Sequence, residues 1–286
     1  MTSDLRAAVA SAVGQPVETA TAIAGGDVNR AFRVRLASGA EVFVKHRIGA
    51  PPGMYTAEAH GLEWLAAVGA LRVPTVVAVR DEAPRLLVLE WIERGAPSPT
   101  HDDELGSGLA QLHRAGAPSF GLDRDNMIAT LPQSNTPTAT WAEFWTTRRL
   151  EPLVRSAVEA GLLLQESLPR WERLFSRMPD LCGPPEPPAR MHGDLWGGNA
   201  IVDATGAPVL IDPAVSGGHR EVDLAMMHLF GGFSQRVFAA YHEASPLADG
   251  HSDRVSLFQL APLLVHLILF GGSYRSAVER ALAHYV

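Results

Sequence analysis

The chain of 286 residues is 47% hydrophobic and 19% charged, a balance that argues against disorder and is typical of one large globular domain or two smaller ones packed together. With a net charge of −7 and no block of Lys and Arg, a broad surface for nucleic acid is not expected, although a local basic pocket for a nucleotide is compatible with it. Cys182 is the single cysteine, which excludes an intrachain disulfide and a cysteine-rich zinc module and fits a reducing cytoplasm.

The first ninety residues are rich in β-strand patterns. Residues 1–13 predict a short amphipathic helix rather than a signal peptide, because charged residues interrupt their alanines. Two runs, 31–36 and 41–45, flank a glycine-containing turn and predict a hairpin. The elements expected after this hairpin are a helix at 58–68 and strands at 73–79 and 86–90.

From about Leu105 the apolar spacing becomes helical. The elements expected here are helices at 141–160, 168–178, 224–244 and 255–270 and a short hairpin at 199–202 and 208–211. The most apolar stretch, 257–270, is interrupted by Gln259, Pro262 and His266 and is too short to cross the ~30 Å hydrocarbon core of a membrane. It is predicted to be a buried core helix, so we expect a cytoplasmic protein with no membrane partner.

One segment in this second part, 192–199, carries the strongest chemical signal. It reads H-G-D-L-W-G-G-N and has the spacing of the catalytic loop of protein-kinase-like phosphotransferases, H-R-D-x-x-x-x-N. Phosphoryl transfer from ATP needs a base near the acceptor hydroxyl and ligands for Mg²⁺. The spacing therefore predicts Asp194 as the base and Asn199 as a metal ligand, with His192 in a structural role.

The next carboxylates follow closely. Asp212 ends the second strand of the predicted hairpin, where the metal-binding Asp of a kinase belongs, with Pro213 in place of the usual Phe. The hairpin sets Asn199 and Asp212 side by side, and two protein oxygens with ATP phosphates suffice for Mg²⁺. The alternative is a plain hairpin whose Asp residues solvate turns, which is the prediction for Asp203. Asp223 is predicted to cap a helix or to brace the catalytic loop as a buried acceptor.

The β-rich part supplies candidates for holding ATP. Lys45 ends a predicted strand, where a kinase lysine holds the α- and β-phosphates, and Glu58 on the next helix is its expected partner. Glu63 is a rival for that pairing. A Lys at a strand end is, taken alone, more often a solvated edge residue. Because Lys45 precedes the helix that carries Glu58, we favour the phosphate-binding interpretation instead.

Two further segments complete the ATP site. The loop that contains Gly25, Gly26, Asp27 and Asn29 precedes the first hairpin strand and is the candidate cover for the phosphates, because glycines let backbone amides approach closely. The connector Leu89–Ile92 offers backbone groups of Glu90 and Ile92 to the adenine edge. The candidate ATP-binding residues of this connector are Leu89, Glu90, Trp91 and Ile92. Trp91 could equally be a buried aromatic residue between the lobes.

The predicted fold class is α+β, a two-lobed protein-kinase-like fold. Residues 1–92 are expected to form a small ATP-binding lobe with an antiparallel sheet and one key helix. Residues 93–286 are expected to form a larger, mainly helical lobe for catalysis and acceptor binding. The histidines show no metal-binding spacing, and His113, His228 and His266 are predicted to pack helices.

With these parts in place, the chain resembles the fructosamine kinase (ketosamine-3-kinase) family, within the wider group of aminoglycoside and choline phosphotransferases. The resemblance rests on the phosphate loop G-G-D-V-N-R-A-F, on the catalytic loop with its Trp196, and on the middle of the chain. The residues that carry it there are Phe120, Gly121, Asp125–Ile128, Leu131–Asn135, Trp141, Phe144 and Arg148–Leu150.

The resemblance implies an ATP- and Mg²⁺-dependent kinase that phosphorylates the 3-hydroxyl of ketosamines, the fructosamine, ribulosamine or erythrulosamine adducts of amines and lysine. The 3-phosphate is unstable and eliminates, which reverses glycation. Some eukaryotic relatives carry a cysteine where Asp27 stands, so a disulfide link through this loop is not expected. The substrate is free or protein-bound, and the enzyme is a monomer or a homodimer.

Acceptor binding is assigned to Trp196 and to Asn126, Gln133 and Asn135, although a purely structural loop at 125–135 is nearly as compatible with the pattern. The alternative function is an aminoglycoside- or choline-type O-phosphotransferase. A pseudokinase would need the loss of the base, a metal ligand or the lysine, and none is lost.

Overall fold

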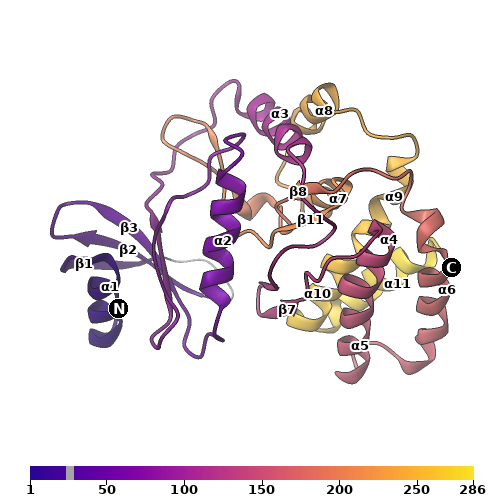
Figure 1. Cartoon of the computed structure of the whole chain (residues 1–286), viewed down its shortest axis with the longest axis horizontal. Coiled ribbons are helices and arrows are strands. Elements are labelled where there is room, and N and C mark those ends of the chain that lie inside the picture. The colour runs from indigo at the N-terminus through magenta and orange to yellow at the C-terminus, as the bar shows by residue number, and fades with distance from the viewer. Residues whose placement is uncertain (24–28) are drawn as a thin grey trace.

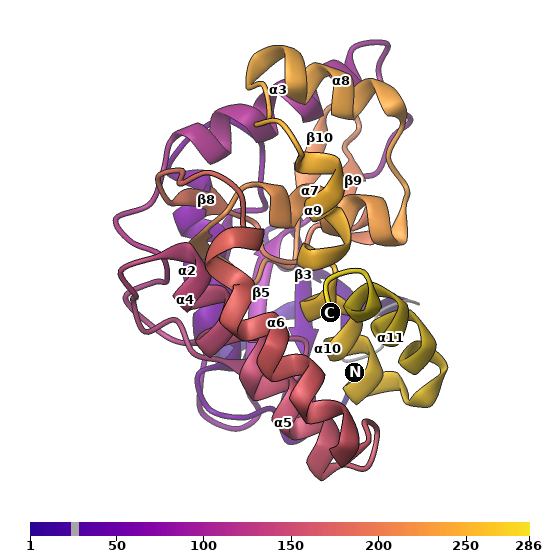
Figure 2. The same cartoon turned by 90° about the vertical axis from the view of Figure 1, so that its right-hand side faces the viewer.

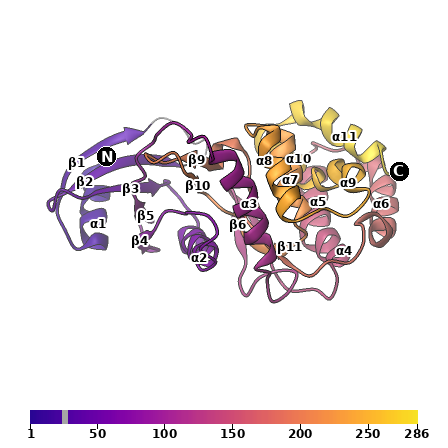
Figure 3. The ribbon, with the colours of Figure 1, turned by 90° about the horizontal axis from the view of Figure 1, so that it is seen from above.

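A computed structural model describes residues 1–23 and 29–286. Two lobes lie side by side, with the strands of the smaller lobe at one end and most helices at the other (Figures 1 and 3). The predicted phosphate-loop residues Gly25, Gly26 and Asp27 lie outside the described residues. The predicted boundary at residue 92 falls just after the last strand of the smaller lobe, which ends at Glu90.

The smaller lobe is built on a five-stranded antiparallel sheet in the order β1-β2-β3-β5-β4. Its strands are β1 (Val17–Ile23), β2 (Arg30–Leu36), β3 (Glu41–His46), β4 (Val76–Arg80) and β5 (Leu86–Glu90). The prediction missed β1. Its sequence, V-E-T-A-T-A-I, contains four β-branched residues but is mostly exposed, and its pairing with β2 at the sheet edge makes it a strand.

Helices α1 (Ser3–Val13) and α2 (Met54–Ala66) cover the two faces of this sheet. Leu86 and Val88 of β5 pack with α1, whereas Leu87 and Leu89 pack with α2. Successive side chains of a strand point to opposite faces, so the continuous apolar run of β5 is buried on both sides. Helix α2 begins earlier than the predicted residue 58, and it carries Glu58 toward the sheet.

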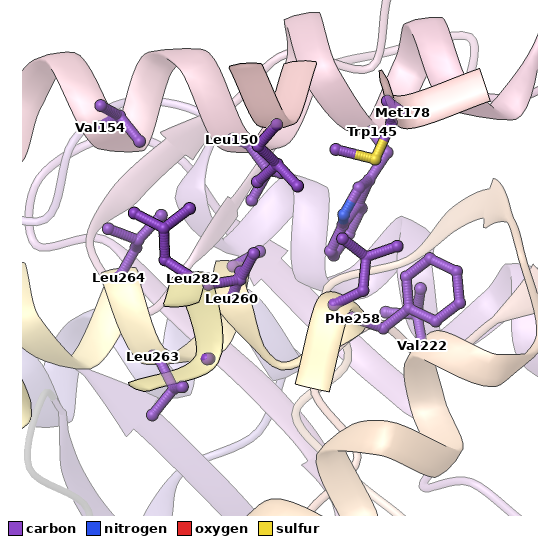
Figure 4. Packing of buried hydrophobic residues seen from close by; sticks show 14 of the residues in the cluster. Trp145, Leu150, Val154, Met178, Val222, Phe258, Leu260, Leu263, Leu264 and Leu282 are labelled. Carbon is purple, nitrogen blue, oxygen red and sulfur yellow. The ribbon is translucent and has the colours of Figure 1, made fainter. Parts of the chain in front are cut away.

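The larger lobe is mainly helical. Its helices are α3 (His101–Arg114), α4 (Trp141–Phe144), α5 (Glu151–Glu159), α6 (Leu168–Leu181), α7 (Glu221–Phe230), α8 (Gln235–Ala244), α9 (His251–Phe258), α10 (Leu260–Phe270) and α11 (Arg275–Ala283). Seen from this lobe, α5 and α6 cross in front of the sheet (Figure 2). Their apolar faces meet those of α9, α10 and α11 in one core that includes Trp145, Leu150, Phe258 and Leu260 (Figure 4).

Three predicted helices are broken. Residues 224–244 form α7 and α8, because Gly231 and Gly232 adopt φ of 69° and 91°, outside the helical range. A π-helical turn, Trp145–Leu150, separates α4 from α5. Residues 251–270 divide into α9 and α10 at Gln259. By length and composition His251–Phe270 could cross a membrane, but its apolar side chains lie in the core, as predicted for a buried helix.

Three short antiparallel strand pairs lie near the junction of the lobes: β6 (Asn126–Ile128) with β7 (Leu131–Gln133), β8 (Ala189–Met191) with β11 (Ser216–Gly218), and β9 (Ala200–Val202) with β10 (Pro208–Leu210). The connector after β5 is bonded to the β9–β10 hairpin, since the amide of Gly95 donates to Val202 (3.1 Å) and that of Ser98 to Gly206 (3.1 Å). Arg72 pairs with both Glu90 and Asp203. The hairpin is thus joined to the smaller lobe.

Candidate active site

A buried carboxylate supports the backbone of the loop 192–199. Asp223 in the first turn of α7 is fully buried and accepts hydrogen bonds from the amides of His192 and Gly193, both at 2.8 Å. Nε2 of His113 in α3 donates to it as well, at 3.0 Å. Burial opposes ionisation, but these hydrogen bonds outweigh it and hold the pKa of Asp223 below its ordinary value. Asp223 therefore links α3 and α7 to the start of the loop.

Gly193 is the one residue of this loop whose conformation demands glycine. Its φ is +82°, and a Cβ added there would lie 2.1 Å from the carbonyl oxygen of Ala214. The amide of Ala214 also donates to the carbonyl of His192 at 2.9 Å. The two chain segments therefore run in direct backbone contact, which leaves no room for a side chain.

His192 connects the loop to the end of β10. Its Nε2 donates to the carbonyl of Ile211 at 3.0 Å, because a carbonyl can only accept, and its Nδ1 then accepts the amide of Asp194 at 3.2 Å. Burial lowers the pKa of His192, which keeps the ring neutral as this pattern requires. The backbone of Asp194 and the residue before Asp212 are thereby held together.

Asp194 and Asn199 lie side by side. The Asn199 amide donates to the carbonyl of Asp194 at 2.8 Å and to its Oδ2 at 3.1 Å, so the carbonyl oxygen of the Asn199 side chain stays available as a ligand. Burial and the neighbouring Asp212 carboxylate raise the pKa of Asp194 to about 7. A carboxyl with such a pKa can take up and release a proton near neutral pH.

Asp212 lies beside this pair, at the end of the β9–β10 hairpin. It adopts φ of +53°, which is uncommon for a residue other than glycine. Its side chain is 41% exposed and pairs with Nζ of Lys45 at 3.0 Å. Asn199 and Asp212 present hard oxygen atoms, the type that Mg²⁺ prefers. No cluster of three or more His, Cys, Asp or Glu that could hold a metal occurs among the described residues.

Lys45 is buried between two carboxylates. It contacts both oxygens of Glu58, at 2.9 and 3.0 Å, in addition to Asp212. Burial opposes the charge of Lys45, but Asp212 and Glu58 together hold its pKa above the usual range. Burial raises the pKa of Glu58 to about 7, against the opposing effect of Lys45. Glu63, the alternative partner, is exposed on the other side of α2.

The predicted phosphate loop is represented in the described residues by Asn29. The hydroxyl of Tyr55 in α2 donates to its Oδ1 at 2.9 Å, and Tyr55 itself is fully buried. Sequence reasoning missed Tyr55, because a tyrosine in an amphipathic helix is ordinarily a core residue. Here it joins α2, which carries Glu58, to the start of β2.

The connector Leu89–Ile92 lines a cavity between the lobes. The amide of Glu90 donates to the carbonyl of Thr75 at 2.9 Å, so the amide of Ile92 is the candidate donor to a base. Trp91 is not buried between the lobes. Its indole donates to Glu93 at 2.8 Å, and the guanidinium of Arg33 lies 4.5 Å from its ring centre.

These side chains meet in a cavity of about 850 Å³ between the lobes, which is within the range of small-molecule sites. Lys45, Glu58, Asp194, Asn199 and Asp212 all line it. Trp196 lines it too and is 43% exposed. Its ring lies over Gly198, where an added Cβ would come within 2.2 Å of the indole. Gly198 therefore makes room for the tryptophan.

The segment 125–135 reaches the cavity in part. Asn126 lines it, and its amide donates to the carbonyl of Val215 at 2.7 Å. Gln133 and Asn135 do not line it. Gln133 donates to Asn126 at 3.3 Å, and Asn135 is fully buried, donating to Arg124 and accepting from Arg149 at 2.6 Å. Their assignment as acceptor-binding residues stays a prediction, since neither side chain lines the cavity. Both instead hold the β6–β7 hairpin that brings Met127, Ile128 and Ala129 to the cavity.

Another set of cavity residues was not predicted from the sequence. They come from α7, α10 and the turn that follows α10, namely Met226, Phe230, Pro262, Val265, His266, Leu269, Phe270 and Tyr274. His266 was expected only to pack helices. It lies in this set, half-buried among aromatic rings. No spacing in the sequence signals the group, because its members fall in elements that meet only in the folded chain.

Known proteins match this chain over its length. A family model described as fructosamine kinase matches residues 1–286. The chain is 38% identical to a "Probable ketoamine kinase" of Lactiplantibacillus plantarum, over 92% of each protein. It is 34% identical to the ketosamine-3-kinase of Mus musculus, over 78% of this chain and 81% of the mouse protein.

Solved structures of similar proteins agree with these sequence matches. A Thermobifida fusca protein described as a "putative fructosamine-3-kinase" superposes with a TM-score of 0.91 and 40% identity, covering 100% of this chain and 99% of that one. The choline kinase LicA of Streptococcus pneumoniae shares the fold alone, with a TM-score of 0.64 and 15% identity over 99% of this chain and 97% of that one. The chain belongs to the fructosamine kinase family.

Proposed function

We propose that this protein is an ATP-dependent ketosamine 3-kinase, which phosphorylates the 3-hydroxyl of the sugar moiety in ketosamines. One observation carries the proposal: Asp194, Asn199, Asp212 and Lys45 converge on one cavity of about 850 Å³. A phosphotransferase needs a base, metal ligands and a cation on the phosphates, and the lining of this cavity offers a candidate for each of them. The class of acceptor is inferred from membership in the fructosamine kinase family and from relatives named for ketosamine and ribulosamine.

The nucleotide end of the cavity is assigned to Leu89–Ile92 and Lys45. The amide of Ile92 is positioned by the strand end to donate to an adenine edge. Lys45, held by Glu58, directs its charge into the cavity and neutralises negative charge on the phosphates. Asn199 and Asp212 would hold Mg²⁺, which would supply further neutralisation of the phosphates.

Asp194 is assigned as the base. Its Oδ2 is held by Asn199, so its other oxygen can accept the proton of the acceptor hydroxyl. That hydroxyl oxygen then forms the new bond to the γ-phosphorus, while the bond from this phosphorus to the bridging oxygen of ADP breaks. The raised pKa of Asp194 suits a group that must take a proton near neutral pH. Elimination of the product phosphate then frees the amine, which reverses glycation.

The proposal includes both free ketosamines and those on protein lysines as acceptors, and a cytoplasmic monomer or homodimer as the active species. Residues 1–92 are assigned to ATP and residues 93–286 to catalysis and the acceptor.

The test is ADP release with fructosyl-, ribulosyl- and erythrulosyl-lysine as acceptors, and with kanamycin and choline as controls. Ketosamine turnover is expected from the wild type. Asp194→Asn should lower kcat by about 10²-fold or more while ATP still binds. Asp180→Asn, an exposed substitution in α6, is the matched control and should leave kcat unchanged. Turnover of kanamycin or choline without ketosamines, or near-normal turnover by Asp194→Asn, contradicts the proposal.

A further inference from the structure

The part of the cavity formed by α10 and its neighbours is aromatic. Phe230, His266, Phe270 and Tyr274 all line it, and we call these four residues the aromatic wall. The ring of His266 is central, with centroids at 4.4 Å from Phe230, 5.3 Å from Phe270 and 5.2 Å from Tyr274. Phe270 is nevertheless 48% exposed. Large hydrophobic side chains exposed together in a cavity mark a binding surface rather than a core.

The aromatic wall adjoins the catalytic loop. A Cβ added at Gly197 would lie 3.0 Å from the carbonyl oxygen of Gly231 and equally near Cα of Gly232. These two glycines directly follow Phe230, the last residue of α7. Trp196, one residue before Gly197, is the other half-exposed aromatic side chain of the cavity. A ligand whose hydroxyl meets Asp194 therefore has the aromatic wall beside it.

His266 presents a hydrogen-bond acceptor in this wall. Its Nδ1 lies 2.8 Å from the carbonyl oxygen of Pro262. Because a carbonyl only accepts, Nδ1 carries the hydrogen, and Nε2 then keeps its lone pair as long as the ring is neutral. Burial lowers the pKa of His266, which favours that neutral form. The wall thus combines apolar ring faces with one acceptor.

The charges around the wall select for a cation. Four acidic side chains line the cavity, Glu58, Glu90, Asp194 and Asp212, whereas the Lys and Arg side chains among its described lining residues are Lys45 and Arg94, in β3 and in the connector beyond β5. Within the aromatic wall no described residue is a Lys, Arg, Asp or Glu. Ring faces attract cations, and a carboxylate on the ligand would be repelled by the carboxylates of the cavity.

We propose that the aromatic wall binds the amine moiety of the acceptor. The protonated secondary ammonium of a ketosamine lies against the ring faces of Phe230, Phe270 and Tyr274 and donates a hydrogen bond to Nε2 of His266. The enzyme therefore prefers ketosamines of apolar or uncharged amines to those with a carboxylate next to the nitrogen. This inference rests on the proposed function and specifies which ketosamines that function serves.

The wild-type test compares two acceptors with the same sugar, fructosyl-benzylamine and fructosyl-glycine. Since one carries an apolar ring and the other a carboxylate beside the nitrogen, kcat/KM for the first should exceed that for the second roughly tenfold or more, a factor that corresponds to about 1.4 kcal/mol. Equal values, or a preference for fructosyl-glycine, overturn the inference. Turnover of kanamycin with neither ketosamine overturns the proposed function and this inference with it.

Substitutions in the aromatic wall then test the contributions of Phe270 and His266 to acceptor binding. Phe270→Ala should lower kcat/KM for fructosyl-benzylamine roughly threefold to thirtyfold, mainly through KM, because a cation–π interaction is worth that much between a partly exposed and a desolvated site. Phe270→Leu keeps apolar bulk without the ring face and should recover only part of that decrease. His266→Phe, which removes the acceptor, should impair both acceptors more than His266→Gln, which keeps one.

Leu164→Ala is the matched control, because Leu164 is 58% exposed and does not line the cavity. Its kcat/KM should equal that of the wild type. Thermal unfolding and the Kd for ATP are measured for every variant, so that a folding defect is distinguished from weaker binding of the acceptor. A stable Phe270→Ala variant whose kcat/KM for fructosyl-benzylamine equals that of the wild type overturns the inference while the proposed function stands.

Discussion

The substitution Asp223→Asn tests how the catalytic loop is held. The side chain keeps its shape but loses its charge and one of its two acceptor oxygens. In the native protein Oδ2 accepts from the amide of His192 and from Nε2 of His113, and Oδ1 accepts from the amide of Gly193. All three donors surround a carboxylate with no exposed surface, so water cannot replace a missing hydrogen bond.

The expected magnitude follows from these three donors. An asparagine oxygen at the Oδ2 position retains His192 and His113, but the side-chain NH₂ then faces the amide of Gly193. Leaving one buried amide without a partner costs about 1–3 kcal/mol, and the two remaining hydrogen bonds each lose about 1 kcal/mol with the charge. We therefore expect the free energy of unfolding to fall by about 3–5 kcal/mol. The kcat should fall as well, because the backbone that carries Asp194 shifts.

Urea unfolding followed by circular dichroism measures this decrease, with Asp180→Asn as the exposed control. Since the folded-state pKa of Asp223 is depressed, its contribution is present above the pKa of an unfolded Asp, about 4, and disappears as pH falls through the folded value. The gap between wild type and variant should therefore persist down to about pH 4 and narrow only below it. An unfolding free energy within about 1 kcal/mol of the wild type at neutral pH refutes the reasoning.

Three further predictions concern the same region. The pKa of Asp194 is raised to about 7, against about 4 in an unfolded chain, so its ionised form opposes folding above pH 7. In urea unfolding, Asp194→Asn should therefore stabilise the ligand-free protein by about 1–3 kcal/mol at about pH 8 and by little near pH 4. A variant less stable than the wild type at pH 8 contradicts this prediction. Gly193→Ala should destabilise the protein by about 2–4 kcal/mol and lower kcat, since its Cβ would collide with Ala214; thermal unfolding and steady-state rates check both effects. Arg72→Met removes the ion pairs that link Glu90 to the β9–β10 hairpin. It should raise KM for ATP roughly fivefold with little change in KM for the acceptor. Equal changes in the two KM values would contradict this prediction.

The sequence alone predicted the arrangement of candidate site residues that depends on short spacing. Asp194, Asn199 and Asp212 fall within one loop and the hairpin that follows it, so local backbone geometry brings them together. The α+β class was equally accessible, because alternating apolar residues in β2 and β3 and the apolar run of β5 are local patterns. Family resemblance added the acceptor class, which no spacing encodes.

Tertiary structure decided what depends on distant segments. β1 is a strand because it pairs with β2, and Asn135 is buried because Arg149 closes over it. Gly231 and Gly232 end one predicted helix early, and their contact with Gly197 places Phe230 beside the catalytic loop.

His266 is the clearest case. As a residue of an apolar helix it is indistinguishable in sequence from a packing histidine. Its Nδ1 bond to Pro262 and its aromatic neighbours from α7 and the turn after α10 place it in the cavity. Periodicity encodes which face of a helix is apolar, whereas the identity of the surface that this face meets depends on the packing of the whole chain.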